Sequence, residues 1–216
     1  MNASERPRIA TQTPIHCSPR PSKGLSGRDG RIIAMTSMDD LLRRVRVKAS
    51  ATPERLPPPV TAEEMAQAES ILGFRLPPVL ARLYREVANG GFGPEYQLFP
   101  LLGEGRTAVS VYREERATAG SDDEATHWPQ DVLPVLDWGC GMFAAVDCRS
   151  PEGAVLLFEP NGIDDEWHHA WYIDSESLAG WLETWLSETG WYEEDADEED
   201  EMRPWETARQ RLSEGN

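Results

Sequence analysis

Residues 61–91 carry the clearest structural signals in the chain, and their sequence is TAEEMAQAESILGFRLPPVLARLYREVANGG. Thr61 and Glu64 have the T-x-x-E spacing of a capping box, in which two side chains satisfy the free backbone N–H groups at the start of a helix. Gly73 follows the apolar face of this helix and supplies the left-handed residue that ends it. Pro77 and the proline after it predict the first turn of a second helix, which ends at the Asn-Gly-Gly of the segment. Two helices are therefore expected to meet at a corner rich in proline and glycine.

Downstream of this segment, apolar residues come in short runs separated by turn sequences, which is the pattern of β-strands. The predicted strands are Tyr96–Leu102, Val132–Trp138, Met142–Cys148, Ala154–Glu159 and Trp167–Ile173. Further helices are predicted from Ser37, over Thr107–Ala119, and from Asp174 or Ser175 to Gly190. The Ser-Pro-Glu-Gly turn of residues 150–153 joins two of the runs as a hairpin. We therefore expect an α+β fold in which helices pack beside a mainly antiparallel sheet.

The ends of the chain lack such patterns, so one folded domain with disordered termini is expected. Residues 1–36 form a basic arm with many Pro and Gly residues, which predicts disorder; alternatively, translation begins at Met35 and the arm is not native. Residues 37–60 predict a short helix followed by a stiff proline-rich linker, and residues 61–192 predict the domain itself. Residues 193–216 begin with a run of like charges and are expected to be an acidic disordered tail.

Charge divides the chain sharply. Residues 1–50 hold ten Lys/Arg and four Asp/Glu, a net charge of +6, whereas the remaining residues hold 11 and 34, a net charge of −23. Such a field disfavours nucleic acid as a partner and would speed encounter with a basic protein; the alternative is that the acidity serves only solubility.

The sequence also bounds the compartment of the protein. It contains neither a secretory signal nor an apolar run long enough for a membrane span, so we expect a cytoplasmic protein without membrane contact. Three cysteines form no dense disulfide framework, and we expect them to be reduced thiols. The oligomeric state is left open.

Three segments in a fixed order carry a family resemblance. They are residues 61–91, Leu133-Pro134-Val135 with Asp137-Trp138-Gly139, and Asp174-Ser175 followed by Leu178, Trp181-Leu182 and Trp185-Leu186. Together they resemble the SUKH superfamily, the Smi/Knr-like domains, over residues 61–190. The resemblance implies structural roles for the motif residues, which are Glu69, Gly73, Leu76, Pro77, Tyr84, Asn89, Gly90, Gly91, Trp138, Gly139, Trp181 and Leu182.

The resemblance also implies a function in protein binding. Bacterial members of this superfamily are immunity proteins that bind and neutralise polymorphic toxins, often nucleases, and fungal relatives are interaction hubs in cell-wall signalling. We therefore expect an immunity-type module that binds a cognate basic toxin; the alternative is a cytosolic scaffold or regulatory module. An enzyme is the least expected function, because the family pattern has no shared catalytic residues and the sequence offers no evident nucleophile–base pair.

Two acidic loops with neighbouring tryptophans form the predicted protein-binding surface, because carboxylates attract a basic partner and Trp is enriched at interfaces. The predicted binding residues are Asp122, Asp123, Glu124, Trp128, Asp164, Asp165, Glu166 and Trp167.

Metal binding and cysteine chemistry are disfavoured, and no cofactor is expected. His168 and His169 offer ligand atoms beside carboxylates, but adjacent residues of a strand point to opposite faces and cannot easily join one site. Cys140 and Cys148 lack a base placed to activate either thiol, so we expect small core side chains and no nucleophile.

Overall fold

The computed structural model of the protein describes residues 38–51, 55–94, 97–117, 127–163, 166–189 and 202–214. These residues form helices beside one antiparallel five-stranded sheet, so the predicted α+β class is confirmed. Their buried apolar side chains form one continuous core that both the helices and the sheet line. The predicted basic arm, residues 1–36, lies outside the described residues.

The sheet has the strand order β1-β2-β3-β4-β5, with every neighbouring pair antiparallel. Its strands are β1 (Val132–Gly139), β2 (Met142–Asp147), β3 (Val155–Phe158), β4 (Trp171–Ser175) and β5 (Arg203–Pro204). The predicted strands of β1, β2 and β3 are confirmed. The register places Phe143, Phe158 and Trp171 side by side across three strands, so three large aromatic side chains share one face of the sheet.

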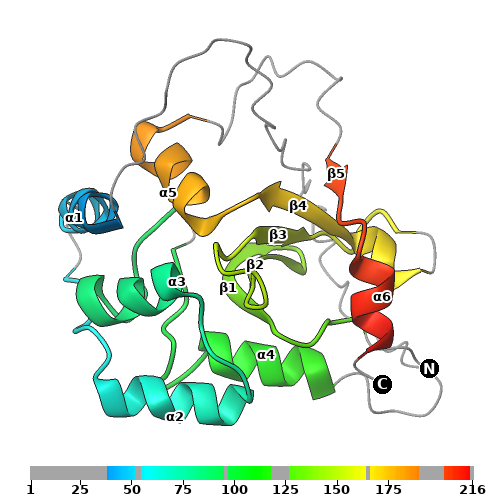
Figure 1. The fold of residues 1–216 in the computed structure, drawn as a ribbon, viewed down its shortest axis with the longest axis horizontal. Helices are drawn as coiled ribbons and strands as arrows, with labels where there is room; N and C mark the ends of the chain where they lie inside the picture. Colours follow the sequence, from blue (N-terminus) through cyan, green and yellow to red (C-terminus); the bar gives the residue numbers. More distant parts are fainter. Residues whose placement is uncertain are drawn as a thin grey trace, which may run out of the picture.

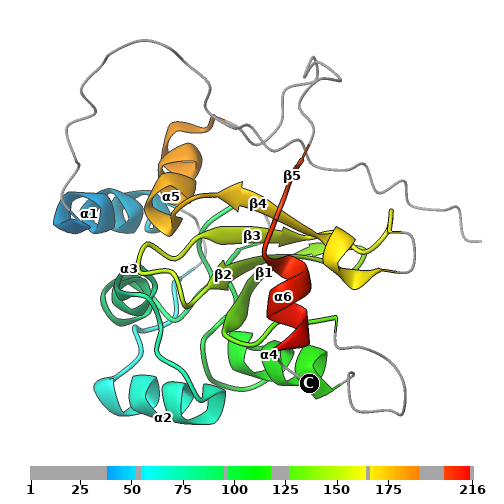
Figure 2. The ribbon, with the colours of Figure 1, turned by 45° about the vertical axis from the view of Figure 1, so that its right-hand side comes forward.

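The helices surround this sheet. They are α1 (Met38–Ala49), α2 (Ala62–Leu72), α3 (Pro78–Arg82), the π-helical turn η1 (Leu83–Val87), α4 (Ala108–Ala117), the 3-10 helix η3 (Trp167–Ala170), α5 (Leu178–Ser187) and α6 (Ala208–Ser213). In Figures 1 and 2, α1, α2 and α3 lie on one side of the molecule and α6 on the other, with the sheet between them. Helix α4 packs against β1, and α6 packs beside η3.

The capping signals of α2 act as predicted. Glu64 N donates to Thr61 Oγ1 at 3.1 Å, and Thr61 N donates to Glu64 Oε2 at 2.7 Å, which completes the capping box. Gly73 ends the helix with a φ of 82°. The second predicted helix begins at Pro78, but its last turn, η1, is a π-helix instead of an α-helix.

The predicted strand Tyr96–Leu102 is wrong over its described part, which is an irregular loop. Gln97 has a left-handed backbone with a φ of 60°. Asn89 Oδ1 accepts a hydrogen bond from Leu101 N at 2.7 Å, and its Nδ2 donates to Leu102 O at 2.8 Å. The side chain of Asn89 thus binds backbone groups that a strand would have used, while the apolar run still contributes buried side chains to the core.

The predicted strand Trp167–Ile173 is correct only from Trp171, because residues 167–170 form η3. The strand β4 then extends through Ser175, so the N-cap of α5 shifts from the predicted positions to Ser177, whose Oγ accepts the Gly180 N–H at 3.0 Å. The predicted α5 therefore exists, with a later start.

The C-terminal segment corrects the predicted disordered tail. Residues 202–214 are described as β5 and α6, whereas residues 190–201 lie outside the described residues. Trp205 and Leu212 are buried, so the segment adds to the core. Residues 202–214 contain only a few apolar residues, so their periodicity is weak. The acidic run before them therefore led to the prediction of a tail.

Candidate functional site

The 3-10 helix η3 and helix α6 form one corner of the molecule, although they are distant in sequence. Five residues line it, and we call them the η3 corner: Glu166, Trp167, His168, His169 and Arg209. Glu166, His169 and Arg209 are exposed, and Trp167 and His168 are partly buried. The corner therefore contains two of the predicted binding residues, Glu166 and Trp167, while Asp122, Asp123, Glu124, Asp164 and Asp165 lie outside the described residues.

Aromatic packing holds η3 in place. The Trp167 ring stacks on Phe158 with ring centroids 6.4 Å apart, and it lies 5.1 Å from the ring of His127. His127 Nε2 in turn lies 2.8 Å from a carboxylate oxygen of Glu115 on α4. Contacts with the aromatic face of the sheet therefore hold Trp167 in place. Because Trp167 is partly buried, only part of its surface is available to a partner.

The prediction that Trp128 is an exposed binding residue is wrong. Trp128 is fully buried, and its Nε1 donates to Val132 O at 2.7 Å. Its ring makes edge contacts with Phe143, Phe158 and Trp171, the aromatic row of the sheet. The acidic loop sequence before it indicated exposure, but the aromatic row on one sheet face provides the apolar surface that buries it.

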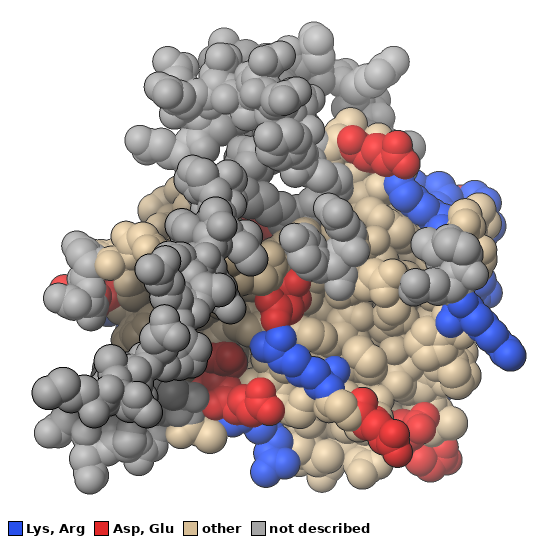
Figure 3. Space-filling view, turned by 180° about the vertical axis from the view of Figure 1, so that it is seen from behind, with Lys and Arg blue, Asp and Glu red and all other residues tan. Residues whose placement is uncertain are grey.

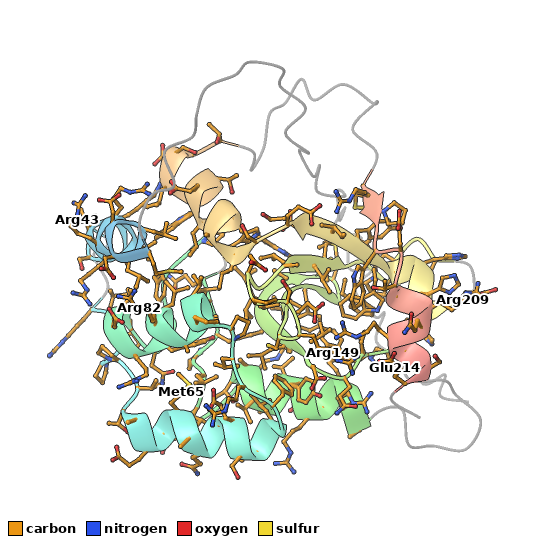
Figure 4. The ribbon with its side chains drawn as sticks, viewed as in Figure 1. Arg43, Met65, Arg82, Arg149, Arg209 and Glu214 are labelled. Carbon is orange, nitrogen blue, oxygen red and sulfur yellow. The ribbon has the colours of Figure 1, made fainter. Side chains whose placement is uncertain are left out.

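A polar network links the two elements of the η3 corner. Arg209 Nη2 donates to Glu166 Oε2 at 2.7 Å and lies 2.9 Å from His168 Nε2. His168 Nδ1 lies 3.2 Å from the same Glu166 oxygen. Because an arginine can only donate, Nε2 of His168 accepts, and the proton of the neutral ring is assigned to Nδ1, facing Glu166. Figure 4 shows Arg209 extending from α6 at this corner.

Helix α6 is anchored to the sheet by a second, buried arginine. Arg211 forms two hydrogen bonds of 3.0 Å with the two carboxylate oxygens of Asp147 on β2, and a third of 3.0 Å with Gln130 O. Arg149 bridges Asp131 and Glu214 near the end of the helix. Sequence reasoning missed Arg209 and Arg211, because both lie in the segment that was expected to be a tail.

Charge on the described surface is mixed. The described residues hold 21 Asp/Glu and 15 Lys/Arg, a net charge of −6, so most of the acidic excess of the chain lies in segments outside them. On the face shown in Figure 3, acidic and basic side chains are interspersed among larger uncharged areas.

One cysteine thiol packs against the core. Cys148 is a free thiol, and burial, followed by the charge of Asp147, raises its pKa well above the ordinary range of a thiol. Such a thiol is a poor nucleophile, which agrees with the expected core role.

The motif residues around the helix corner make backbone contacts. Glu69 Oε1 accepts the Leu76 N–H at 3.1 Å, which fixes the turn between α2 and α3. Tyr84 Oη donates to Phe99 O at 3.0 Å, and Asn89 binds the following loop as described above. A Cβ atom on Gly90 would lie 2.4 Å from Phe99 O, so this position requires glycine.

The residues from the capped α2 through β1–β4 and into α5 lie within the match to one family model. The model of the SMI1 / KNR4 family (SUKH-1) matches residues 59–184, which is more than half of the chain. The chain belongs to this family. The resemblance predicted from the sequence is therefore confirmed, and no individually curated protein matched the chain.

Two parts of this SUKH protein lie outside the family match. Helix α1 precedes it, and β5 with α6 follows it, yet both contribute buried side chains to the common core. The η3 corner thus joins a family element, η3, to an arginine from outside the family match. None of the helices in the described parts of the chain has the length and apolar character that a membrane span requires.

Proposed function

We propose that this SUKH protein is an immunity-type inhibitor that neutralises a cognate basic toxin, nuclease-like in kind, by binding it directly in the cytoplasm. The observation that carries the proposal is its membership of the SUKH-1 family over residues 59–184, together with the net charge of −23 after residue 50. Membership of the SUKH family supports a function as an immunity or Smi/Knr-type binding module. The negative charge favours a basic partner through long-range attraction.

The proposed contact surface is the η3 corner together with Asp164 and Asp165, which precede it in sequence, and the acidic segment Asp122-Asp123-Glu124. Glu166 is exposed, and part of the Trp167 ring remains accessible. An anchored aromatic ring beside carboxylates suits a basic partner, because the ring supplies apolar contact area at low entropic cost while the carboxylates steer association. Trp128 has no part in this surface, since it is buried.

The first test is a pull-down with the full chain from lysate of the source cells, at low and then high salt, with bound proteins identified by mass spectrometry. We expect a basic, nuclease-like protein that is released by salt. Co-expression of that protein with the SUKH chain is then expected to relieve its toxicity. Recovery of signalling or envelope-synthesis proteins alone would favour the alternative, a cytosolic scaffold of the Smi/Knr type.

A matched pair of variants tests the proposed surface. The test variant neutralises the predicted loop carboxylates: Asp122→Asn, Asp123→Asn, Glu124→Gln, Asp164→Asn, Asp165→Asn and Glu166→Gln. The control variant neutralises six exposed carboxylates elsewhere: Glu63→Gln, Glu104→Gln, Glu114→Gln, Glu152→Gln, Glu188→Gln and Glu206→Gln. We expect the association rate and its salt dependence to fall much further in the test variant than in the control. Equal affinities and equal salt dependence in the two variants would rule out this surface.

A further inference from the structure

The structure removes the main sequence-based objection to a metal site at the two adjacent histidines. That objection assumed a strand, in which His168 and His169 would point to opposite faces. Residues 167–170 instead form the 3-10 helix η3, and the two imidazole rings lie 4.0 Å apart between centroids. Glu166, immediately before η3, adds a carboxylate, and the ligand atoms of the three residues all lie within 4.8 Å of one another.

These distances suit a zinc ion after small side-chain rotations. Zinc binds imidazole nitrogen and carboxylate oxygen at about 2.0–2.2 Å, so tetrahedral ligand atoms lie roughly 3.4 Å apart. His168 Nδ1 and Glu166 Oε2 already lie 3.2 Å apart. His169 and Glu166 are exposed, so their side chains can rotate without displacing the core. Two nitrogen ligands and one oxygen ligand favour zinc over the oxygen-preferring Mg²⁺ and Ca²⁺.

Arg209 already acts as the cation of this cluster. Its guanidinium binds the Glu166 oxygen at 2.7 Å and His168 Nε2 at 2.9 Å. If a metal binds Nδ1 of the neutral His168 ring, the ring proton is on Nε2. The Nε2–H donor would then face the N–H donor of Arg209 Nη2, which is unfavourable. A metal on Nε2 would take the position of Arg209 directly. Arg209 must therefore move away when a metal binds at either nitrogen.

We propose that Glu166, His168 and His169 form a zinc site in which Zn²⁺ exchanges with the Arg209 guanidinium. This inference does not depend on the proposed toxin binding, because the site is complete within one chain. It also predicts that zinc loosens a contact between α6 and η3, while the buried Arg211–Asp147 pair keeps α6 on the sheet.

Isothermal titration of the full, untagged chain with zinc chloride tests the proposal. We expect one zinc per chain in the wild type. His168→Ala and His169→Ala are each expected to weaken binding at least about tenfold, because each removes a ligand. Arg209→Ala is expected to strengthen binding roughly fivefold, because it removes a competing positive charge at an exposed, screened site.

Two controls come from the exposed ion pair of Arg203 and Glu176. Arg203→Ala and Glu176→Gln also break an arginine–glutamate contact of the C-terminal segment, and we expect wild-type zinc binding in both. Absence of zinc binding in the wild type would overturn the proposal. So would unchanged binding in both histidine variants, which would place the zinc elsewhere, and weaker binding in Arg209→Ala would overturn the exchange.

Discussion

Replacement of Arg211 by alanine tests whether the C-terminal segment is an integral part of the fold. The side chains of Arg211 and Asp147 are only 9% and 12% exposed, and two hydrogen bonds of 3.0 Å join them. Removing one partner of a buried ion pair costs about 3–5 kcal/mol, because the other charge stays buried without its counter-charge. Asp147 retains the backbone N–H of Arg149 at 3.1 Å, which lowers the cost. We therefore expect Arg211→Ala to lower the free energy of unfolding by about 3 kcal/mol.

Urea unfolding monitored by tryptophan fluorescence measures this change. Arg203→Ala is the matched control, because its pair with Glu176 is exposed on both sides, at 58% and 71%. Exposed pairs contribute about 0–1 kcal/mol, so the control is expected to unfold nearly as the wild type does. If Arg211→Ala lowers the free energy of unfolding by less than about 1 kcal/mol, as a surface substitution does, the docked position of α6 is refuted.

Three further predictions concern the helix corner and the buried thiol. Gly90→Ala is expected to lower the free energy of unfolding by more than about 3 kcal/mol or to prevent folding, because its Cβ would lie 2.4 Å from Phe99 O. Gly73→Ala, which has open space around its Cβ, is expected to lower it by only about 1 kcal/mol. Thermal unfolding of the two variants compares these losses. Asn89→Ala leaves two backbone groups of the following loop without their partner, and urea unfolding is expected to show a loss of about 2 kcal/mol. Cys148 is expected to resist alkylation in the native state and to react once the chain is unfolded, as mass spectrometry can follow, because burial raises its pKa. Because the thiol of the unfolded chain ionises at lower pH than the native thiol, Cys148 lowers the free energy of unfolding as the pH rises above the ordinary thiol pKa of about 8.5. Equal alkylation rates of native and unfolded Cys148 would contradict its burial.

Local signals predicted the elements that depend on local interactions. The capping box of Thr61 and Glu64 and the left-handed Gly73 lie within a few residues of the bonds they form, so the bounds of α2 follow from the sequence. The loop after Pro94 was predicted as a strand, because its apolar residues are indeed buried. Asn89 binds the backbone of that loop from 12 and 13 residues before its two partners, and no periodic pattern of apolar residues reveals such a side-chain contact.

The candidate site was only partly predictable for the same reason. Composition placed Glu166 and Trp167 in an accessible, acidic segment, and the structure brings them to one corner. Trp128 has the same kind of neighbours in sequence but is buried by aromatic residues of three different strands. Arg209 reaches the corner only because α6 docks beside η3, and a docking contact between distant segments has no periodic signature.

Most of the net negative charge of this protein lies outside the residues that form its described core. The described residues carry a net charge of −6, whereas the chain as a whole carries −17. Neutralising carboxylates outside the described residues is therefore expected to remove most of the field that attracts a basic partner. A variant without the Asp and Glu of residues 193–201 is accordingly expected to unfold at the same urea concentration as the wild type. If the proposed partner is basic, the same variant associates with it more slowly at low salt and equally fast at high salt, where the field is screened in both proteins.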